Sequence, residues 1–290
     1  MKGSFVLFQM AARHVDNHPM GIARIDVLGV GISAINMDQA IAELARWVDE
    51  SKQHYVCVTG VHGVMESQSD QALLEIHNRS GLTTPDGMPM VWAGKRAGAD
   101  QMSRVYGPDL MLEICRQSPA RGWRHYFYGG KEGVPDLLAR RLQEQFPGLQ
   151  VVGTYSPPFR ALTDSESDEI ASMINEAKPH FVWVGLSTPK QERWMDANIG
   201  RLNAPALLGV GAAFDIHAGL LPQAPGWMQQ RGLEWLYRLI KEPRRLWKRY
   251  LGNNPRFLLK VLRHPPRIVS IAQLAGGSPP PNPATESEVH

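Results

Sequence analysis

The sequence predicts an α/β fold in which a mostly parallel, Rossmann-like sheet is flanked by helices and followed by a basic, amphipathic helical appendage. Two observations predict the sheet. Short apolar runs alternate with segments of helical periodicity, which is the order of elements in parallel α/β proteins. The runs are also almost continuously apolar and rich in β-branched and aromatic residues, as expected for strands buried on both faces. A concentration of basic residues near the C-terminus predicts the appendage.

Seven apolar runs are predicted to be strands, and four segments between them are predicted to be helices. The strands cover residues 24–32, 55–60, 82–87, 124–130, 149–156, 180–187 and 206–214, and the helices cover 36–51, 133–146, 163–177 and 188–202. Two of these helices carry explicit start signals. Thr163 with Glu166 and Thr188 with Gln191 fit the capping box, and Pro189 would occupy the first position of the second helix.

Length and composition indicate an ordinary globular protein. The chain has 290 residues, enough for one large domain or two small ones, and 43% of them are hydrophobic while 20% are charged. Cys57 and Cys115 offer neither a disulfide framework nor a metal pattern, so a reducing cytoplasm is expected. No apolar run approaches the length of a membrane span. We expect a flexible leader over 1–22, an α/β core over 23–225, the appendage over 226–270 and a disordered tail over 271–290.

Charge is distributed unevenly along the chain. Between Gly226 and Ser270 there are eleven Lys and Arg residues against two acids, which leaves 20 basic and 26 acidic residues elsewhere. The basic segment is predicted to form three short helices broken at Pro243 and at Asn254-Pro255. Its basic faces flank aromatic and leucine side chains, which suits either an anionic membrane interface or a helix packed on the body with a solvated basic face. No nucleic-acid module is recognised. The residues predicted to face the membrane are Arg244, Trp247, Lys248, Phe257 and Lys260.

Polar residues gather where the predicted strands end. In open α/β sheets, ligands bind beyond the C-terminal ends of the strands, so these residues are the candidates for a site. After the strands at 55–60 and 82–87 they are Thr59, His62 and Asp86; after the later strands they are Gly129, Gly130, Lys131, Gly185, Thr188, Pro189, Lys190, Gln191, Glu192, Gly209, Gly211 and Asp215.

Two of these segments suggest a bound nucleotide. Gly29, Gly31 and Ala34 fit a dinucleotide fingerprint, but Thr59 stands where the ribose-binding acid of a nicotinamide site is expected. The helix predicted to begin near Thr188 offers free backbone N–H groups and a favourable dipole, and Lys190 adds positive charge, so it could seat a diphosphate. The alternative is that these residues only cap the helix.

Asp86 and His62 each allow a structural and a functional interpretation. Pro-Asp-Gly is a strong turn signal by itself, yet the same rigid frame would hold the Asp86 carboxylate at a strand end as a general base. His62 is either a helix cap or a contact to substrate. The acidic run that begins at Thr163 is explained by the dipole of the helix it opens, and no residue pattern indicates a metal site. We therefore expect phosphate to be bound by backbone and basic groups, without a metal cofactor.

The chain resembles the WecG/TagA/CpsF glycosyltransferases. The resemblance is carried, in order, by the stretches TPDGMPMVWAGKRAG, YGPDLM, YFYGGKEGV, VGLSTPKQERWM, GVGAAFDIHAG and APGWMQQRGLEWLYRLIKEPRRLWKRY. It implies an inverting enzyme, peripheral on the cytoplasmic face of the inner membrane, that moves a hexose from a UDP-sugar to a polyprenyl-diphosphate-linked sugar. It also implies that Asp86 is the catalytic base with Thr59 beside it in the pocket, and that Arg238, Arg245 and Arg249 meet the diphosphate.

The donor sugar is the finer question. The stretch VCVTGVHGVMESQ is most similar to the branch that adds glucose from UDP-glucose in xanthan-type exopolysaccharide assembly. Many family members have asparagine where this chain has Val61, and N-acetylated donors are usual among them. Transfer of N-acetylmannosamine or its uronic acid therefore stays open, as do a non-catalytic, membrane-tethered nucleotide-sugar binding protein and a homo-oligomeric state.

Overall fold

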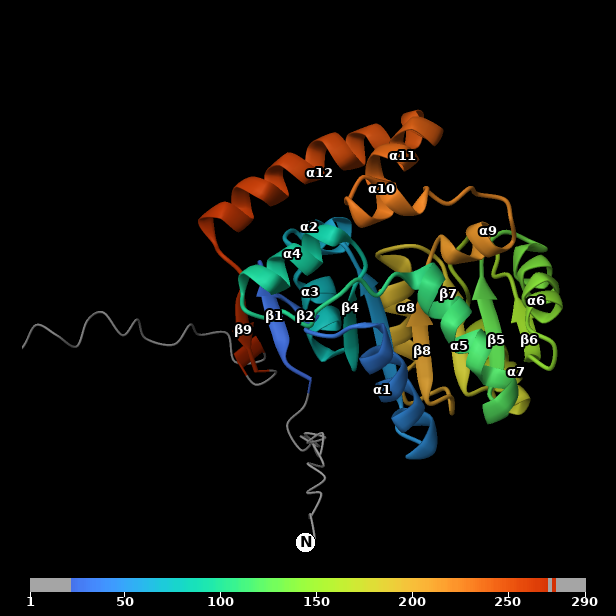
Figure 1. Ribbon diagram of the computed structural model, residues 1–290. Helices are drawn as coiled ribbons and strands as arrows, with labels where there is room; N and C mark the ends of the chain where they lie inside the picture. Colours follow the sequence, from blue (N-terminus) through green and yellow to red (C-terminus); the bar gives the residue numbers. More distant parts are fainter. Residues whose placement is uncertain (1–21, 271–272, 275–290) are drawn as a thin grey trace, which may run out of the picture.

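The computed structural model describes residues 22–270 and 273–274, and its centre is a parallel sheet of six strands (Figure 1). The spatial order is β4-β3-β8-β7-β5-β6, and every neighbouring pair is parallel. The predicted α/β fold is thus confirmed. The predicted leader, apart from Ile22, and most of the predicted tail lie outside the described residues. The strands are β3 (His54–Thr59), β4 (Leu82–Pro85), β5 (Arg124–Gly129), β6 (Gln150–Tyr155), β7 (Phe181–Gly185) and β8 (Ala206–Gly209).

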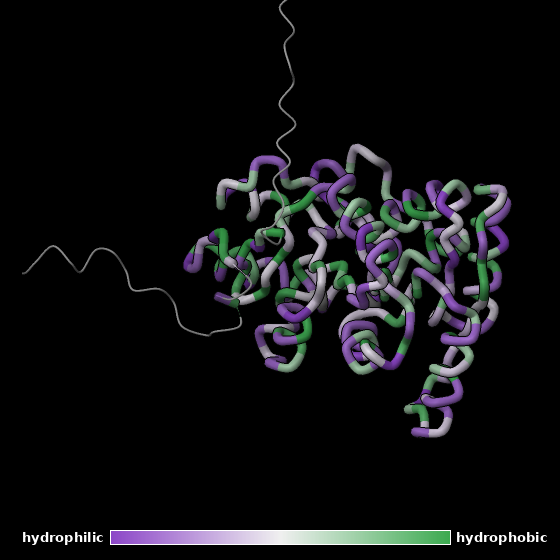
Figure 2. Tube along the Cα trace, turned by 90° about the horizontal axis from the view of Figure 1, so that it is seen from below, coloured by the Kyte–Doolittle hydropathy of each residue, from purple (hydrophilic) through white to green (hydrophobic). Residues whose placement is uncertain are grey.

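Helices cover both faces of this sheet and form two separate cores. Successive strand side chains point to opposite faces, so Phe127 packs with one core while Tyr126 and Tyr128 pack with the other. Figure 2 shows hydrophobic and hydrophilic positions alternating along many helical turns, as expected for amphipathic helices. The helices are α1 (Met37–Asp49), α2 (Val61–Ser67), α3 (Gln71–Arg79), α4 (Met88–Arg96), α5 (Gly107–Arg121), α6 (Val134–Gln145), α7 (Asp164–Ala177), α8 (Lys190–Asn198) and α9 (Ala213–His217).

The predicted strand at 24–32 is wrong, because this segment is a hairpin. β1 (Arg24–Val27) and β2 (Val30–Ser33) pair antiparallel around Leu28 and Gly29, whose φ angles are 55° and 86°. Two positive φ values suit the tight turn of a hairpin. Leucine is not a typical turn residue, so the local sequence does not predict the turn. Gly29 and Gly31 consequently lie in a hairpin and not at a strand-to-helix junction, which removes the geometry that a dinucleotide fingerprint requires.

Of the two predicted capping boxes, one is confirmed. Thr163 accepts from the backbone of Glu166 and the Glu166 side chain accepts from the Thr163 backbone, as the pattern predicts. The second is wrong. Helix α8 has Pro189 as its N-cap, the backbone N–H of Gln191 donates to the Ser187 carbonyl, and the Thr188 hydroxyl donates to Glu192 Oε1 at 2.8 Å. The Thr188 hydroxyl is thereby aimed along the helix and does not cap it.

The basic segment forms α10 (Gly226–Gln230), α11 (Glu234–Lys241) and α12 (Pro243–Arg263), which lie over the edge where the parallel strands end (Figure 1). The predicted break at Pro243 is confirmed, but α12 continues through Pro255. Proline removes one intrahelical hydrogen bond, the one that would end on the Leu251 carbonyl. Leu251 is exposed, so water can satisfy that carbonyl and the helix tolerates the loss.

The end of the basic segment returns to the body of the molecule. After α12, the chain forms β9 (Arg267–Val269), which pairs antiparallel with β1 in a three-stranded sheet of order β2-β1-β9 (Figure 1). Arg24 of β1 joins this small sheet to β4. Its buried guanidinium donates to the carbonyls of Ser80 at 2.6 Å and Gly81 at 3.0 Å, and to the Thr83 hydroxyl at 3.0 Å. Burial lowers its pKa to about 10, so it is still charged at neutral pH.

We predict that Arg24→Ala lowers the free energy of unfolding by about 3–5 kcal/mol, because it leaves several buried acceptors without a donor. Urea denaturation followed by tryptophan fluorescence measures this. Arg96→Ala on the exposed side of α4 is the matched control and should change stability by less than about 0.5 kcal/mol. Equal effects of the two substitutions would contradict a structural role for the Arg24 network.

Candidate active site

Thr59 and Asp86 lie side by side at the ends of β3 and β4. The strands pair in parallel with Thr59 opposite Pro85, and the Asp86 backbone N–H donates to the Thr59 carbonyl at 3.1 Å. The Thr59 hydroxyl is buried, and no hydrogen-bond partner for it lies within the part of the chain that the structure describes. A buried hydroxyl without a partner loses free energy unless something bonds to it. The pair of strand ends therefore presents one carboxyl group and one available hydroxyl together.

The Asp86 carboxyl group is held in a poorly solvated but accessible position. The residue is half-buried, and its Oδ1 lies 3.4 Å from the backbone N–H of Gly107 at the start of α5. Desolvation raises the pKa of Asp86 to about 6, and the nearby carboxylate of Glu234 adds to the effect, while Arg104, the Gly107 N–H and Arg238 oppose it. A carboxylate with a pKa near neutrality suits proton transfer at physiological pH.

Helix α11 brings a cation to this carboxyl group. Burial works against the charge of Arg238, but the electrostatic effects of Tyr250, Tyr106, Glu234 and Asp86 outweigh it and raise the Arg238 pKa. The Nε of Arg238 is buried, and among the described residues no acceptor bonds to it. A half-buried guanidinium with an unused Nε donor beside a strand-end carboxyl group is suited to an anionic ligand. Arg245 and Arg249 belong to α12, but the structure does not describe their side chains.

The glycines predicted to contact a nucleotide line the ends of β5, β7 and β8. Gly129 and Gly130 have φ angles of 119° and 75°, and the Gly130 N–H donates to the Gly185 carbonyl at 2.9 Å. A Cβ on Gly129 would come within 2.8 Å of the Gly185 backbone, so only glycine fits there. Gly211, with φ of 50°, donates to the Val184 carbonyl at 3.3 Å. The three strand ends thus present closely packed backbone that a ligand can approach.

Helix α8 starts at the same edge. Gln191 is buried, with Nε2 donating to Glu192 Oε1 at 3.1 Å, and its Oε1 has no partner among the described residues. Lys131 and Lys190 are exposed at the edge and Asp215 of α9 is half-buried. The structure therefore brings the predicted nucleotide-binding residues to one edge, beside Thr59 and Asp86, because β8 lies between β3 and β7.

His62 and the predicted membrane residues have mixed placements. His62 Nδ1 lies 3.4 Å from Asn253 Nδ2 of α12 and 3.5 Å from Glu66 Oε1, so His62 contributes to the contact between α2 and α12. Phe257 was expected at a membrane surface, but it is buried among the hydrophobic residues of β1, β2 and α4. Amphipathic spacing alone could not tell the buried stripe of α12 from its exposed one. Arg244, Trp247, Lys248 and Lys260 are exposed.

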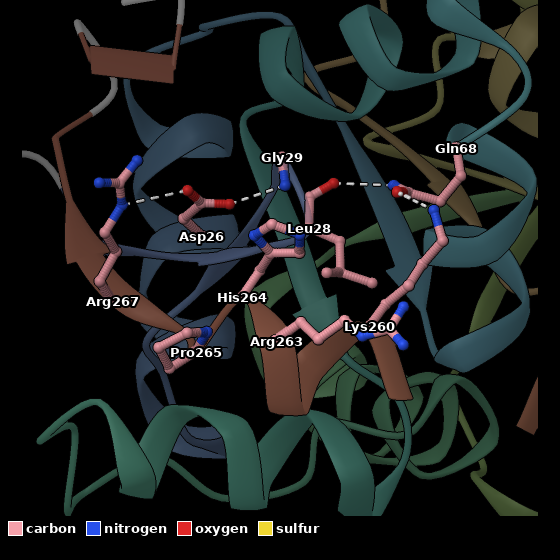
Figure 3. A pocket seen from close by; sticks show the side chains of 9 residues that line it. All are labelled: Asp26, Leu28, Gly29, Gln68, Lys260, Arg263, His264, Pro265 and Arg267. Carbon is pink, nitrogen blue, oxygen red and sulfur yellow. Dashed lines mark hydrogen bonds and ion pairs between the residues drawn. The ribbon is translucent and has the colours of Figure 1, made fainter. Parts of the chain in front are cut away.

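A shallow cavity of about 700 Å³ lies at the other end of α12 (Figure 3). It is bounded by the β1–β2 turn, by Gln68 just after α2 and by the residues that lead into β9. The interactions drawn there join neighbouring segments: Asp26 accepts from Gly29 and Arg267, and Gln68 contacts both Lys260 and the Leu28 carbonyl. Apart from Gly29 of the dinucleotide fingerprint, which the hairpin rules out, the lining contains no predicted catalytic or nucleotide-binding residue, so the cavity is not the candidate active site.

Sequence reasoning missed three residues beside Asp86. Arg104 donates from Nε to the Asp86 carbonyl at 2.8 Å and pairs with the carboxylate of Glu234, and the Tyr106 hydroxyl donates to Glu234 Oε1 at 2.7 Å. Glu234 carried a signal, because it is one of two acids in the basic segment. Arg104 stands just before the YGPDLM stretch, but no local pattern connects it with a carboxylate 130 positions away.

Within residues 22–270 and 273–274, no group of three or more His, Cys, Asp or Glu side chains is arranged to hold a metal ion. None of the helices described is long and apolar enough to cross a membrane.

Comparison with known proteins identifies the class of this protein as a glycosyltransferase. Residues 25–268 match the model of the glycosyl transferase WecG/TagA/CpsF family, so the chain belongs to that family. It is 27% identical over 237 residues to an N-acetylglucosaminyldiphosphoundecaprenol N-acetyl-beta-D-mannosaminyltransferase of Bacillus subtilis strain 168, covering 79% of this chain and 90% of the relative. Proteins of the same description from Bacillus spizizenii and Staphylococcus aureus strain MW2 are 27% and 24% identical over 75% and 83% of this chain, and 82% and 93% of their own lengths are covered.

The raised pKa of Asp86 leads to a stability prediction. Since the folded-state pKa of about 6 exceeds the ordinary value of 3.8, folding favours the protonated carboxyl group, and its ionisation costs stability as pH rises through 6. Asp86→Asn removes that cost. We predict that the stability of this variant relative to the parent increases between pH 4 and pH 7, by up to about 3 kcal/mol.

Urea titrations at both pH values measure the difference. Asp100→Asn at an exposed position is the control for the loss of one carboxylate. A relative stability of Asp86→Asn that falls with pH would show that the ionised carboxylate stabilises the fold, contrary to the desolvation argument.

Proposed function

We propose that this glycosyltransferase moves a hexose from a UDP-sugar to a hydroxyl group of a polyprenyl-diphosphate-linked sugar, with inversion and with Asp86 as general base. The observation that carries the proposal is the Asp86 carboxyl group, which is accessible at a strand end, has a pKa of about 6 and lies beside the unused hydroxyl of Thr59 and the guanidinium of Arg238. The names of the relatives, which act on a diphosphoundecaprenol-linked sugar, support the acceptor class.

The chemistry follows from this arrangement. Asp86 takes the proton of the acceptor hydroxyl as its oxygen bonds to the anomeric carbon, and the bond from that carbon to the diphosphate oxygen breaks with both electrons leaving on UDP. Attack on the face opposite UDP inverts the centre. Arg238 stabilises the charge that grows on the departing diphosphate. The family resemblance assigns the same role to Arg245 and Arg249. Glycines at the ends of β5, β7 and β8 and the start of α8 would seat the nucleotide.

N-acetylmannosamine is the first candidate for the transferred sugar, because the curated relatives are named for it, with N-acetylglucosamine as the sugar of the acceptor. Glucose is the second candidate, supported by Val61. This residue stands two positions after Thr59, at the start of α2, where many family members have asparagine, and it packs against the core of the β1–β2 hairpin. An apolar side chain there cannot bond to an acetamido group, whereas a glucose donor does not need that bond.

A transfer assay tests the function. Radiolabelled UDP-N-acetylmannosamine, UDP-glucose and UDP-N-acetylmannosaminuronic acid are each offered with polyprenyl-diphosphate-N-acetylglucosamine and polyprenyl-diphosphate-glucose, in EDTA and with added Mg²⁺. We expect transfer in EDTA, with kcat/KM falling about tenfold per pH unit below pH 6 as Asp86 becomes protonated. Nucleotide-sugar binding without transfer under every condition would indicate a binding protein instead.

Asp86→Asn separates the catalytic role from a structural turn. We expect nearly unchanged UDP binding and a turnover lowered by roughly 10²–10⁴, the usual effect of losing a general base. Full activity would exclude Asp86 as the base.

We also propose that the exposed face of α12 contacts an anionic membrane, where the acceptor lies. Trp247, Leu251, Leu258 and Leu262 are between 48% and 65% exposed and follow helical spacing along one face. Exposed Arg244, Lys248, Lys260 and Arg263 flank them. Apolar side chains beside cations are typical of helices that lie in a membrane interface.

Cosedimentation with vesicles tests this surface. We expect binding to vesicles with phosphatidylglycerol, weakened by salt, and at least about tenfold weaker binding of Leu258→Ser/Leu262→Ser, because each leucine buries apolar area in the interface. Met173→Ser, which removes an exposed apolar side chain from α7, is the control. Binding unaffected by the double substitution would exclude this face of α12.

A further inference from the structure

Arg104 connects the turn that carries Asp86 with two elements of the appendage. Its Nε donates to the Asp86 carbonyl at 2.8 Å, its Nη1 donates to Gln229 Oε1 of α10 at 2.9 Å, and its Nη2 pairs with Glu234 of α11. The guanidinium also lies over the Tyr106 ring, 3.9 Å from its centroid. The Arg104 side chain thus contacts the turn at Asp86, α10 and α11 at the same time.

The ion pair is built into the interface and is not a surface contact. The side chains of Arg104 and Glu234 are only 14% and 17% exposed. Glu234 receives a second hydrogen bond from the Tyr106 hydroxyl, so both of its oxygens are occupied by groups of the core. Isolated surface pairs contribute little, whereas a poorly solvated pair with additional hydrogen bonds is strongly destabilised when one partner is removed.

We propose that Arg104 and Glu234 are positioning residues that make the docking of α11 and the placement of Asp86 a single event. This inference rests on the proposed role of Asp86 as base. If α10 and α11 leave together, Arg104 loses Gln229 and Glu234, two of its three hydrogen-bonded partners. Asp86 then loses both Glu234 and Arg238. Asp86 keeps its backbone hydrogen bond to Thr59, but the Arg104 side chain that bonds to its carbonyl is no longer fixed, and two of the charges that set its pKa are gone. A glycosyltransferase whose base is completed only by a docked appendage avoids exposing an activated donor sugar to water.

The charges around Asp86 make the idea testable by pH. Five groups face Asp86. Two belong to α11, Glu234 and Arg238, and three come from the start of α5 and the loop before it: Arg104, Tyr106 and the Gly107 N–H. Glu234 raises the pKa of Asp86, whereas Arg104 and Arg238 lower it. Removing the charge of Glu234 should therefore move the acid limb of the pH–rate profile to lower pH, and removing that of Arg238 should move it to higher pH.

The experiment compares Glu234→Gln with the parent in the full-length chain. Glutamine keeps the shape of the side chain but removes the charge that pairs with Arg104. We therefore expect faster amide hydrogen exchange in residues 234–241, a lower plateau kcat and an acid limb of kcat/KM displaced to lower pH. Glu113→Gln, which removes a carboxylate from an exposed ion pair with Arg116, is the control. It should change neither the exchange rate in residues 234–241 nor the position of the acid limb. Tyr106→Phe removes a single hydrogen bond to Glu234 and should raise exchange by a smaller factor.

Each result decides between alternatives. Unchanged exchange in 234–241 together with an unmoved acid limb in Glu234→Gln would overturn the proposal, even if Asp86→Asn is inactive and the role of the base stands. Faster exchange with an unmoved limb would also overturn it, because docking would then be uncoupled from the base. If Asp86→Asn is fully active, the proposed base fails, and the coupling proposal fails with it.

Discussion

The parallel hydrogen bonding between β3 and β4 is the constraint on which the site depends. It fixes Thr59 opposite Pro85 and lets the Asp86 N–H bond to the Thr59 carbonyl at 3.1 Å. Because all six strands of the sheet run in the same direction, the same constraint brings Gly129, Gly185 and Gly211 to this edge. Thr59 and Gly211, which are 152 positions apart in the chain, thereby share one surface, and no single strand could present these residues alone.

The basic segment closes this surface because it is fastened at both ends. At one end Glu234 of α11 bonds to Arg104 and Tyr106 of the core. At the other, β9 pairs with β1, and Phe257 of α12 is buried in the hydrophobic core formed with β1, β2 and α4. A helix held only by its hydrophobic face could slide or detach, whereas two fixed ends leave α12 with one face against the body and one face outward.

Several groups at this edge lower the stability of the fold in ways that fit a catalytic site. The Thr59 hydroxyl and the Gln191 Oε1 are buried without partners among the described residues. The ionised form of Asp86 is disfavoured by burial, and Gly129 occupies a position where any side chain would collide with the Gly185 backbone. Unsatisfied and strained groups persist where function requires them and the surrounding structure compensates. Here the compensation includes the hydrogen bonds that the Arg24 guanidinium donates to Thr83 and Ser80 and the two hydrophobic cores.

The sequence by itself determined the parallel α/β sheet, most of its elements and the position of Asp86 at a strand end, because apolar periodicity and turn chemistry are local properties. It also determined the break at Pro243. The Leu28-Gly29 turn, the continuation of α12 through Pro255 and the burial of Phe257 were decided by tertiary packing, which overrides local preference. Only the fold could place Glu234 beside Arg104 and Asp86, because these residues are far apart in the chain. The pKa of Asp86 depends on those charges and on its burial, so local sequence could not predict it.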